Sequence, residues 1–174
     1  MNWTQTVFEV IDMRSFSNLW FWIALAVMWS TASYWVLGVP FDMIQRATRG
    51  DEEAVSDLQH MVHINVKRIL YITGRSGLWL VGFLCFFLTT LAILGFVYNV
   101  EFAQALVLLG VPMTIVWSFA IRMAHIINVE GYEPETLIRR LIRQRILTQF
   151  VGMFSIFVTA TYGMFQNIGG GNGF

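Results

Sequence analysis

The residues whose types and spacing best suit chemistry are Asp57, His60 and His63. Residues three positions apart share one face of a helix, so two imidazoles and one carboxylate could meet a single divalent cation there. Two histidines at this spacing are a weak signal, because interfacial histidines without a metal are the commoner arrangement. We therefore predict no metal site and keep these three residues as the only candidates for one.

A second group is basic and consists of four arginines that lie close together: Arg139, Arg140, Arg143 and Arg145. They stand directly before an uncharged stretch, where guanidinium groups can hold anionic lipid head groups at about 1 kcal/mol for each base near the surface. The alternative is that they only fix the orientation of the chain across a membrane. We predict lipid or partner contacts for all four and leave the alternative open.

Trp29 falls near the middle of an apolar stretch, where its indole N–H has no water to bond. The N–H therefore needs a partner on another helix or on a bound molecule. Packing between neighbouring membrane helices is the simpler interpretation, and contact with a lipid, quinone or pigment is the alternative. Trp29 is accordingly predicted to contact a lipid or a partner.

The apolar stretches lack the groups that usually perform catalysis. No Walker loop, GxSxG, HExxH or kinase motif occurs. The single cysteine, Cys85, excludes an intrachain disulfide and four-cysteine metal sites, and we expect it to be packing material. No histidine lies mid-stretch to ligate a haem or chlorophyll, and Arg122 and His125 stand where side chains can reach water. We predict no catalytic residue, no cofactor and no enzymatic activity.

These residues belong to a chain with four stretches that contain no charge, at residues 15–41, 76–100, 102–121 and 146–174. Each is long enough to cross roughly 30 Å of hydrocarbon, which takes about 20 helical residues. Apolar residues make up 56% of the chain and charged residues only 13%, whereas soluble domains have about 25% charged residues. The sequence thus predicts four transmembrane helices rather than a soluble bundle. With 11 basic and 11 acidic residues, binding to nucleic acid is not expected.

The positions of the charges predict the orientation. Every Lys and Arg except Arg14 lies in one of the two long links between stretches, so the positive-inside rule places both links in the cytoplasm. In the first link, apolar residues recur every three or four positions at Val55, Leu58, Val62, Val66 and Ile69. We therefore predict an all-α integral membrane protein with four transmembrane helices, two cytoplasmic amphipathic helices and N-out/C-out topology.

The predicted elements form one membrane domain over residues 1–174. They are an interfacial N-terminal arm (1–16), a first span (18–40), a cytoplasmic helix (51–73), a second span (76–98), a third span (102–124), a second cytoplasmic helix (134–146), a fourth span (147–167) and a flexible tail (168–174). Pro112 predicts a kink in the third span. The sequence Leu-Gly-Val-Pro occurs at 37–40 and again at 109–112, at different predicted depths, and we interpret this match as chance.

Residues 8–43, FEVIDMRSFSNLWFWIALAVMWSTASYWVLGVPFDM, resemble a group of small bacterial four-span membrane proteins that are catalogued as a component of the SufBCD complex of iron–sulfur assembly. The resemblance implies a multi-pass protein of the bacterial inner (cytoplasmic) membrane that docks soluble cluster-assembly proteins there. It carries no functional residue over to this chain. With one cysteine and no ATPase motif, the chain cannot itself scaffold a cluster or drive its assembly.

Together these features predict a noncatalytic accessory or assembly subunit. Its expected partners are the lipid bilayer, other membrane subunits or copies of itself, and anionic lipid. The alternative is an oligomeric channel or transporter for a small solute or ion, in which uncharged hydroxyl groups line the pore. A membrane enzyme built on the histidine cluster is the third hypothesis. The hydroxyl groups available for a pore are those of Thr89, Thr90, Ser118, Thr159 and Thr161.

Overall fold

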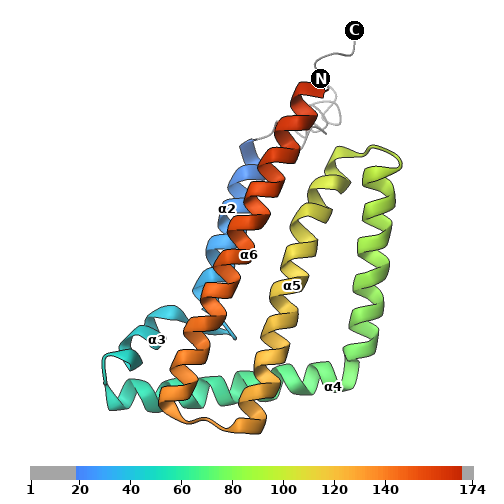
Figure 1. The fold of residues 1–174 in the computed structure, drawn as a ribbon. Helices are drawn as coiled ribbons and strands as arrows, with labels where there is room; N and C mark the ends of the chain where they lie inside the picture. Colours follow the sequence, from blue (N-terminus) through green and yellow to red (C-terminus); the bar gives the residue numbers. More distant parts are fainter. Residues whose placement is uncertain (1–18, 170–174) are drawn as a thin grey trace, which may run out of the picture.

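The computed structural model describes residues 19–169 and is helical apart from one short β-hairpin (Figure 1). The elements in chain order are α2 (Leu19–Tyr34), β1 (Trp35–Val36), β2 (Val39–Pro40), α3 (Phe41–Thr48), α4 (Glu52–Phe96), α5 (Glu101–Glu130) and α6 (Pro134–Gly169). The predicted N-terminal arm (1–16) and residues 170–174 of the predicted tail lie outside the described residues.

The helical fold class is confirmed, and within residues 19–169 three helices are long and apolar enough to cross a membrane: α4, α5 and α6. The fourth apolar helix, α2, has 16 described residues and is therefore about 24 Å long. α2 and α6 run side by side. α5 and the second half of α4 stand next to them, with their axes roughly aligned with those of α2 and α6 (Figure 1). The chain has the architecture of a membrane protein.

The helix α4 corrects the prediction of two separate helices at 51–73 and 76–98. It is one helix of 45 residues with a sharp bend (Figure 1). We call residues 52–73 the α4 arm and residues 78–96 the upright segment. The residues between them include Gly74, Ser76 and Gly77, and such Gly/Ser clusters are common sites of helix kinks. The bend redirects the chain, while the helix itself does not end.

The helix α6 likewise replaces the two predicted helices at 134–146 and 147–167. Its 36 residues form a single straight helix, because no glycine or proline follows Pro134 before Gly152. The helix also includes residues 168 and 169, which were predicted to belong to the flexible tail. The charged and apolar parts of α6 are therefore rigidly connected. α5 similarly continues past the predicted end at 124 and stops before Gly131, whose φ is 93°.

The first predicted span, 18–40, ends as a helix at Tyr34. Residues 35–40 instead form the hairpin, in which Trp35 pairs with Pro40 and Val36 with Val39. Leu37 and Gly38 make the turn with φ values of 53° and 75°, the backbone of a type I′ turn. Gly38 adopts a positive φ at no steric cost, whereas the backbone of Leu37 is strained there. The side chain of Leu37 is only 5% exposed, and its burial helps to offset this strain.

The short helix α3 was not predicted. It follows Pro40, which has no backbone N–H to donate. Just before a helix this costs nothing, because an N–H there would have no partner within the helix. Phe41, Ile44 and Ala47 recur every three residues, and the last two are buried. This short apolar repeat is the signal from which the helix could have been predicted.

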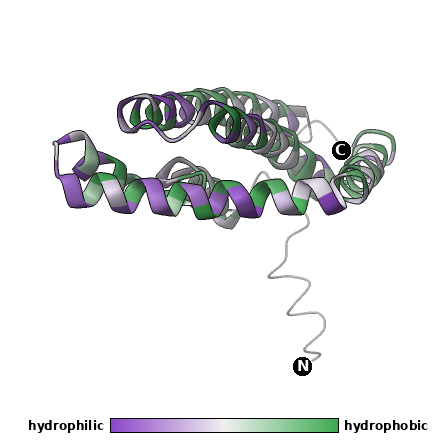
Figure 2. Ribbon diagram, turned by 90° about the horizontal axis from the view of Figure 1, so that it is seen from below, coloured by the Kyte–Doolittle hydropathy of each residue, from purple (hydrophilic) through white to green (hydrophobic). Residues whose placement is uncertain are grey.

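The most tightly packed region lies at one end of the molecule, which we call the base: the hairpin, α3, the α4 arm and the link at 131–133. The α4 arm crosses this end, with hydrophilic and hydrophobic residues alternating along it (Figure 2). Its residues Leu58, Val62 and Val66 are buried, and they belong to the apolar stripe identified in the sequence. The other buried members of this cluster are Val36, Leu37, Val39, Ile44, Ala47, Ala124, Ile127, Leu137 and Leu141. The opposite end, with the link at 97–100, we call the top.

Candidate functional site

The three candidate metal ligands lie on the α4 arm but do not form a metal site. His60 is exposed, and its Nδ1 lies 2.8 Å from the carbonyl oxygen of Ser56, to which the ring N–H donates. His63 packs edge-on against the ring of Tyr132, with 4.9 Å between ring centroids. Within residues 19–169, no group of three or more His, Cys, Asp or Glu side chains is arranged to hold a metal ion.

Of the four arginines predicted to act together, two are paired with carboxylates. Arg139 is exposed and lies 3.5 Å from Glu135 on the same helix, a surface ion pair one turn apart. Arg140 forms a salt bridge with Glu130, which stands at the last position of α5. This second pair connects the end of α5 to α6 across the link at the base.

Arg145 has a different role. Its guanidinium carbon lies 3.3 Å from the centre of the Phe41 ring, so a cation–π contact ties α6 to α3. Its Nε is buried and, within the described residues, has no hydrogen-bond partner. Arg145 is thus part of the packing of the base. Of the four, Arg143 is the one with neither a carboxylate nor a ring partner in the described part of the chain.

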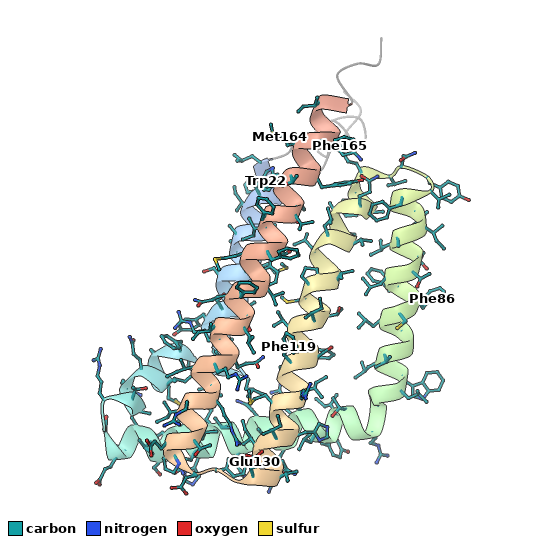
Figure 3. All side chains as sticks on the ribbon, in the orientation of Figure 1. Trp22, Phe86, Phe119, Glu130, Met164 and Phe165 are labelled. Carbon is teal, nitrogen blue, oxygen red and sulfur yellow. The ribbon has the colours of Figure 1, made fainter. Side chains whose placement is uncertain are left out.

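Arg143 instead lines a groove between α5 and α6, together with Arg140 and a third cation, Arg122 of α5. The groove has a volume of about 460 Å³. No functional role was predicted for Arg122. The signal that could have indicated one is its position directly after Ile121, where the uncharged stretch of α5 ends. Figure 3 shows Phe119 between α5 and α6 and Glu130 at the base. The remaining lining residues are Phe119, Met123, Ile126, Gln144 and Leu147.

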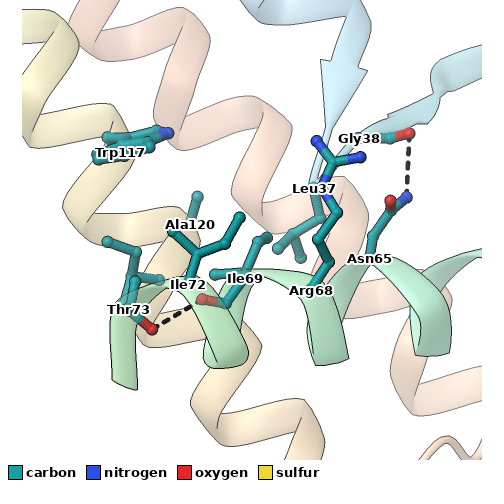
Figure 4. A pocket seen from close by; sticks show the side chains of 10 residues that line it. Leu37, Gly38, Asn65, Arg68, Ile69, Ile72, Thr73, Trp117 and Ala120 are labelled. Atoms are coloured by element: carbon teal, nitrogen blue, oxygen red, sulfur yellow. Dashed lines mark hydrogen bonds between the residues drawn. The ribbon is translucent and has the colours of Figure 1, made fainter. Parts of the chain in front are cut away.

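A second hollow, of about 220 Å³, lies above the α4 arm and beside the hairpin (Figure 4). Asn65 donates through Nδ2 to the carbonyl oxygen of Gly38 at 3.2 Å and so holds the hairpin to the arm. The side chain of Arg68 rises beside Leu37, and Trp117 of α5 stands across the hollow (Figure 4). It contains one cation, whereas the groove between α5 and α6 contains three.

A third hollow, of about 360 Å³, is a second space between α5 and α6, around Pro112. Its lining is apolar except for Ser155, whose buried hydroxyl has no hydrogen-bond partner within the described residues. Nothing in this lining selects one apolar molecule over another. It is a surface that lipid chains can cover.

Trp29 lies buried between α2 and α6, at 4% exposure. Its ring fills the space above Gly152, where an added Cβ would come 2.7 Å from Cε3 of the indole. The indole N–H has no hydrogen-bond partner among the described residues. The structure therefore places Trp29 in a contact between two helices of this chain.

The face of α6 on which Trp29 rests carries small residues that the sequence analysis did not recognise. They recur every three or four positions, all of them buried, and such spacing lets membrane helices approach closely. Their regular spacing in an apolar helix is the signal that could have identified this face. The residues are Thr148, Gly152, Ser155, Thr159 and Gly163.

A network of amide side chains joins three helices near the top. Gln104 of α5 is 2% exposed and donates through Nε2 to the carbonyl oxygen of Gly95 on α4, at 2.8 Å. Gln166 of α6 donates to Oε1 of Gln104 at 3.0 Å, and also lies 3.0 Å from the hydroxyl of Tyr162. Glutamines inside uncharged stretches were the sequence signal for this network, which was not predicted.

The hydroxyl groups proposed for a pore lie on three different helices. Thr90, Ser118 and Thr161 are exposed, and each donates to the carbonyl oxygen four residues earlier in its own helix, at 2.8 to 2.9 Å. Thr159 is completely buried, so it does not lie on a surface that copies of the chain could share. Cys85, expected to be packing material, is exposed on the upright segment of α4.

No protein family, no curated protein and no solved structure matches this chain. Three features of the described residues bear on its function: the arginine-lined groove at the base, the exposed side chains of the upright segment, and the packing of α2 on α6.

Proposed function

We propose that this chain is a noncatalytic accessory or assembly subunit of the bacterial inner membrane, which packs its helices against a larger membrane complex or against copies of itself. The observation that carries the proposal is one uncovered face of the upright segment of α4. In the most apolar part of α4 only 6% of residues are buried within the chain, against 28% in α6.

This open face of α4 consists of Leu78, Gly82, Cys85 and Thr89, which recur every three or four positions and are all exposed. Three of the four are small. Membrane helices associate through such faces, because small side chains let two backbones approach closely and gain packing contacts that lipid chains do not provide. The open face lies opposite the side of α4 that carries the buried Leu91 and Gly95.

The other helical glycines with close neighbours support this interpretation. Gly95 lies against Gln104 and Gly152 against Trp29, at distances that leave no room for an added Cβ, and an added Cβ at Gly110 would lie 3.0 Å from the side chain of Leu88. Gly82, in the upright segment, has no atom within 4 Å of the position of an added Cβ. The chain thus uses small residues for its internal helix contacts, and Gly82 offers the same kind of position to a helix from outside the chain.

The membrane arrangement we propose has four spans, with α2 as the first, both termini outside and the base in the cytoplasm. The four helices run between the base and the top, and the arginines and the α4 arm lie at the base, where the positive-inside rule expects cytoplasmic charge. On this arrangement the α4 arm and the first residues of α6 are the two cytoplasmic amphipathic segments.

The resemblance of residues 8–43 to the SufBCD-associated membrane proteins leads us to propose soluble cluster-assembly proteins as partners on the cytoplasmic side. The base then supplies their docking surface, since the hairpin and the start of α3 belong to both the base and the resembling run. A pull-down from solubilised membranes with mass spectrometry would identify such a partner in stoichiometric amount.

The accessory role is tested by Gly82→Leu, which enlarges the open face at a position where an added Cβ has no atom of the described chain within 4 Å. We expect the variant to fold normally but to lose at least tenfold in co-purification with the partner or in self-association in mild detergent. The matched control is Ala160→Leu, which enlarges an exposed small residue of α6. A wild-type protein that migrates as a stable, partnerless monomer, or equal losses in both variants, would contradict the proposal.

A further inference from the structure

The groove between α5 and α6 combines three cations with an apolar wall. Arg122, Arg140 and Arg143 line it, and Phe119 and Leu147 line it as well. Of the three arginines, Arg140 is paired with Glu130, whereas Arg122 and Arg143 are exposed and have no ion-pair partner within residues 19–169. One carboxylate cannot neutralise three guanidinium groups, so the groove has an excess of positive charge.

The position of the groove along the two helices is specific. On α5 the uncharged run ends at Ile121 and Arg122 follows; on α6 the last charge is Arg145 and the uncharged run begins at Ile146. The groove spans the boundary between charged and uncharged residues on both helices. Its arginines lie on the charged side, and Phe119 and Leu147 lie among the uncharged residues. A molecule that fills it meets guanidinium groups at one end and apolar side chains at the other.

From this arrangement we infer that the groove is a binding site for an anionic glycerophospholipid, with the phosphate held by Arg122 and Arg143 and the start of an acyl chain lying against Phe119 and Leu147. Guanidinium groups bind phosphate oxygens through paired N–H donors, which makes arginine well suited to this group. The volume of about 460 Å³ accommodates a head group. The apolar wall favours a lipid over a free phosphate ion, which would leave it uncovered. The inference does not depend on the proposed accessory role.

The other arginines of the base are excluded from this site by their own contacts. Arg139, one turn before Arg143, does not line the groove and lies beside Glu135, and Arg145 lies on the ring of Phe41. Only two of the four residues predicted from the sequence as lipid contacts therefore line the groove, and Arg122 joins them from α5. The site consists of residues from two consecutive helices, which the link at 131–133 turns back on each other.

The test is native mass spectrometry of the purified full chain in mild detergent, titrated with phosphatidylglycerol and, separately, with phosphatidylcholine. We expect tighter binding of the anionic lipid. Arg122→Gln and Arg143→Gln should each weaken phosphatidylglycerol binding about fivefold, the equivalent of about 1 kcal/mol for one base near an anionic surface. The double variant should lose about 20-fold or more.

The matched control is the double variant Arg75→Gln, Arg139→Gln, which removes two exposed charges. Neither residue lines the groove, so binding should change less than about twofold, well below the loss from a base that contacts the phosphate. If the control lost as much phosphatidylglycerol binding as the groove variants, the lipid would be held by diffuse attraction to basic residues, and the proposed site would be wrong. Equal binding of the two lipids would overturn it too, and this comparison needs no variant, so it holds even where a variant fails to fold. Competition by millimolar inorganic phosphate would assign the groove to free anions instead of lipid.

Discussion

At the scale of single residues, the packing of this protein depends on which glycines are covered. Gly152 and Gly82 are both helical, and both stand in apolar surroundings. Only Gly152 has a neighbour in this chain, the indole of Trp29, and only there does the missing Cβ make room for a side chain. The residue type is the same, and the opposing helix decides its role.

We predict that Gly152→Ala destabilises the protein by about 1–3 kcal/mol, because the new methyl group would lie 2.7 Å from the Trp29 ring and overpack the α2–α6 contact. Gly82→Ala is the matched control and should be neutral or slightly stabilising, since alanine favours a helix by up to about 1 kcal/mol. Thermal unfolding in detergent measures both. Trp29→Phe should restore part of the stability lost in Gly152→Ala, and a failure to do so would place the strain elsewhere.

The second prediction at this scale concerns Tyr132 in the link between α5 and α6. Burial raises the pKa of its hydroxyl above the ordinary value of 10.0, and that hydroxyl has no hydrogen-bond partner within the described residues. Above about pH 10 the unfolded chain therefore loses this proton before the folded chain does. The folded state then binds more protons, so stability falls as the pH rises through this range and is unaffected below it.

Tyr132→Phe should accordingly remove part of the loss of stability between pH 8 and pH 11, at little cost at pH 8, because it deletes a buried hydroxyl that bonds nothing in the described chain. The melting temperature at the two pH values measures the effect. Tyr98→Phe, at an exposed tyrosine, is the control. Identical alkaline losses in the wild type and in Tyr132→Phe would contradict the prediction.

At the scale of elements, the tetrapeptide Leu-Gly-Val-Pro shows how context selects structure. At 37–40 it forms the turn and second strand of the hairpin, and at 109–112 it continues the helix α5. The first copy follows a helix after which the chain must reverse at the base, and there Asn65 donates a hydrogen bond to the carbonyl oxygen of Gly38 in the turn. The second copy lies mid-helix between apolar neighbours. The two occurrences therefore have no structural equivalence.

Gly38→Ala should destabilise the protein by about 1–3 kcal/mol, since alanine is strained at a φ of 75°. Its Cβ would also come 3.0 Å from Nδ2 of Asn65 and disturb the hydrogen bond that holds the hairpin. Gly50→Ala is the control, because it has a φ of 86° but no atom within 4 Å. It should show the backbone cost alone.

A double-mutant cycle separates the two causes for Gly38. In an Asn65→Ala background the contact is absent, so Gly38→Ala should cost about as much as Gly50→Ala does. Chemical or thermal unfolding in detergent supplies the four stabilities. An unchanged cost in this background would mean that the contact with Asn65 contributes nothing.

At the scale of the whole molecule, the cluster of buried apolar residues lies at one end. The base brings the hairpin, α3, the α4 arm and the adjoining ends of α5 and α6 into one cluster. Above it, large apolar side chains of the upright segment, such as Trp79 and Phe86, are 83% and 71% exposed. In a bilayer, lipid or a partner helix covers such side chains, so the molecule combines a compact base with apolar helices that touch one another and also present large apolar side chains outward.

The proposed topology gives a prediction at this scale. In a Cys85→Ser background, a cysteine placed at Asn99 in the top link should react with a membrane-impermeant thiol reagent added to intact cells. A cysteine placed at Glu133 in the base link should react only after the membrane is opened. Mass shifts of the purified protein give the extent of labelling. The reverse pattern, or equal labelling of the two positions, would overturn the N-out/C-out arrangement.

The all-helical class of this protein could be predicted from its sequence. Long runs without charge and the shortage of charged residues overall predict helices that suit a membrane, since a buried backbone in lipid must satisfy its own hydrogen bonds. The apolar stripe at Leu58, Val62 and Val66 could likewise be predicted from its spacing, because the periodicity of a helix depends only on neighbouring residues in the sequence. The candidate arginines were also identified, though as one group with one role.

How these helices and arginines are arranged became apparent only in the folded chain. It kept α4 and α6 continuous where a change in polarity predicted breaks, because polarity alone does not end a helix. It assigned Arg139, Arg143 and Arg145 to an ion pair, a groove and an aromatic ring, and it brought Arg122 to Arg143 from another helix. Such contacts depend on which faces of distant segments meet, and the spacing of residues along one segment holds no information about the face presented by another.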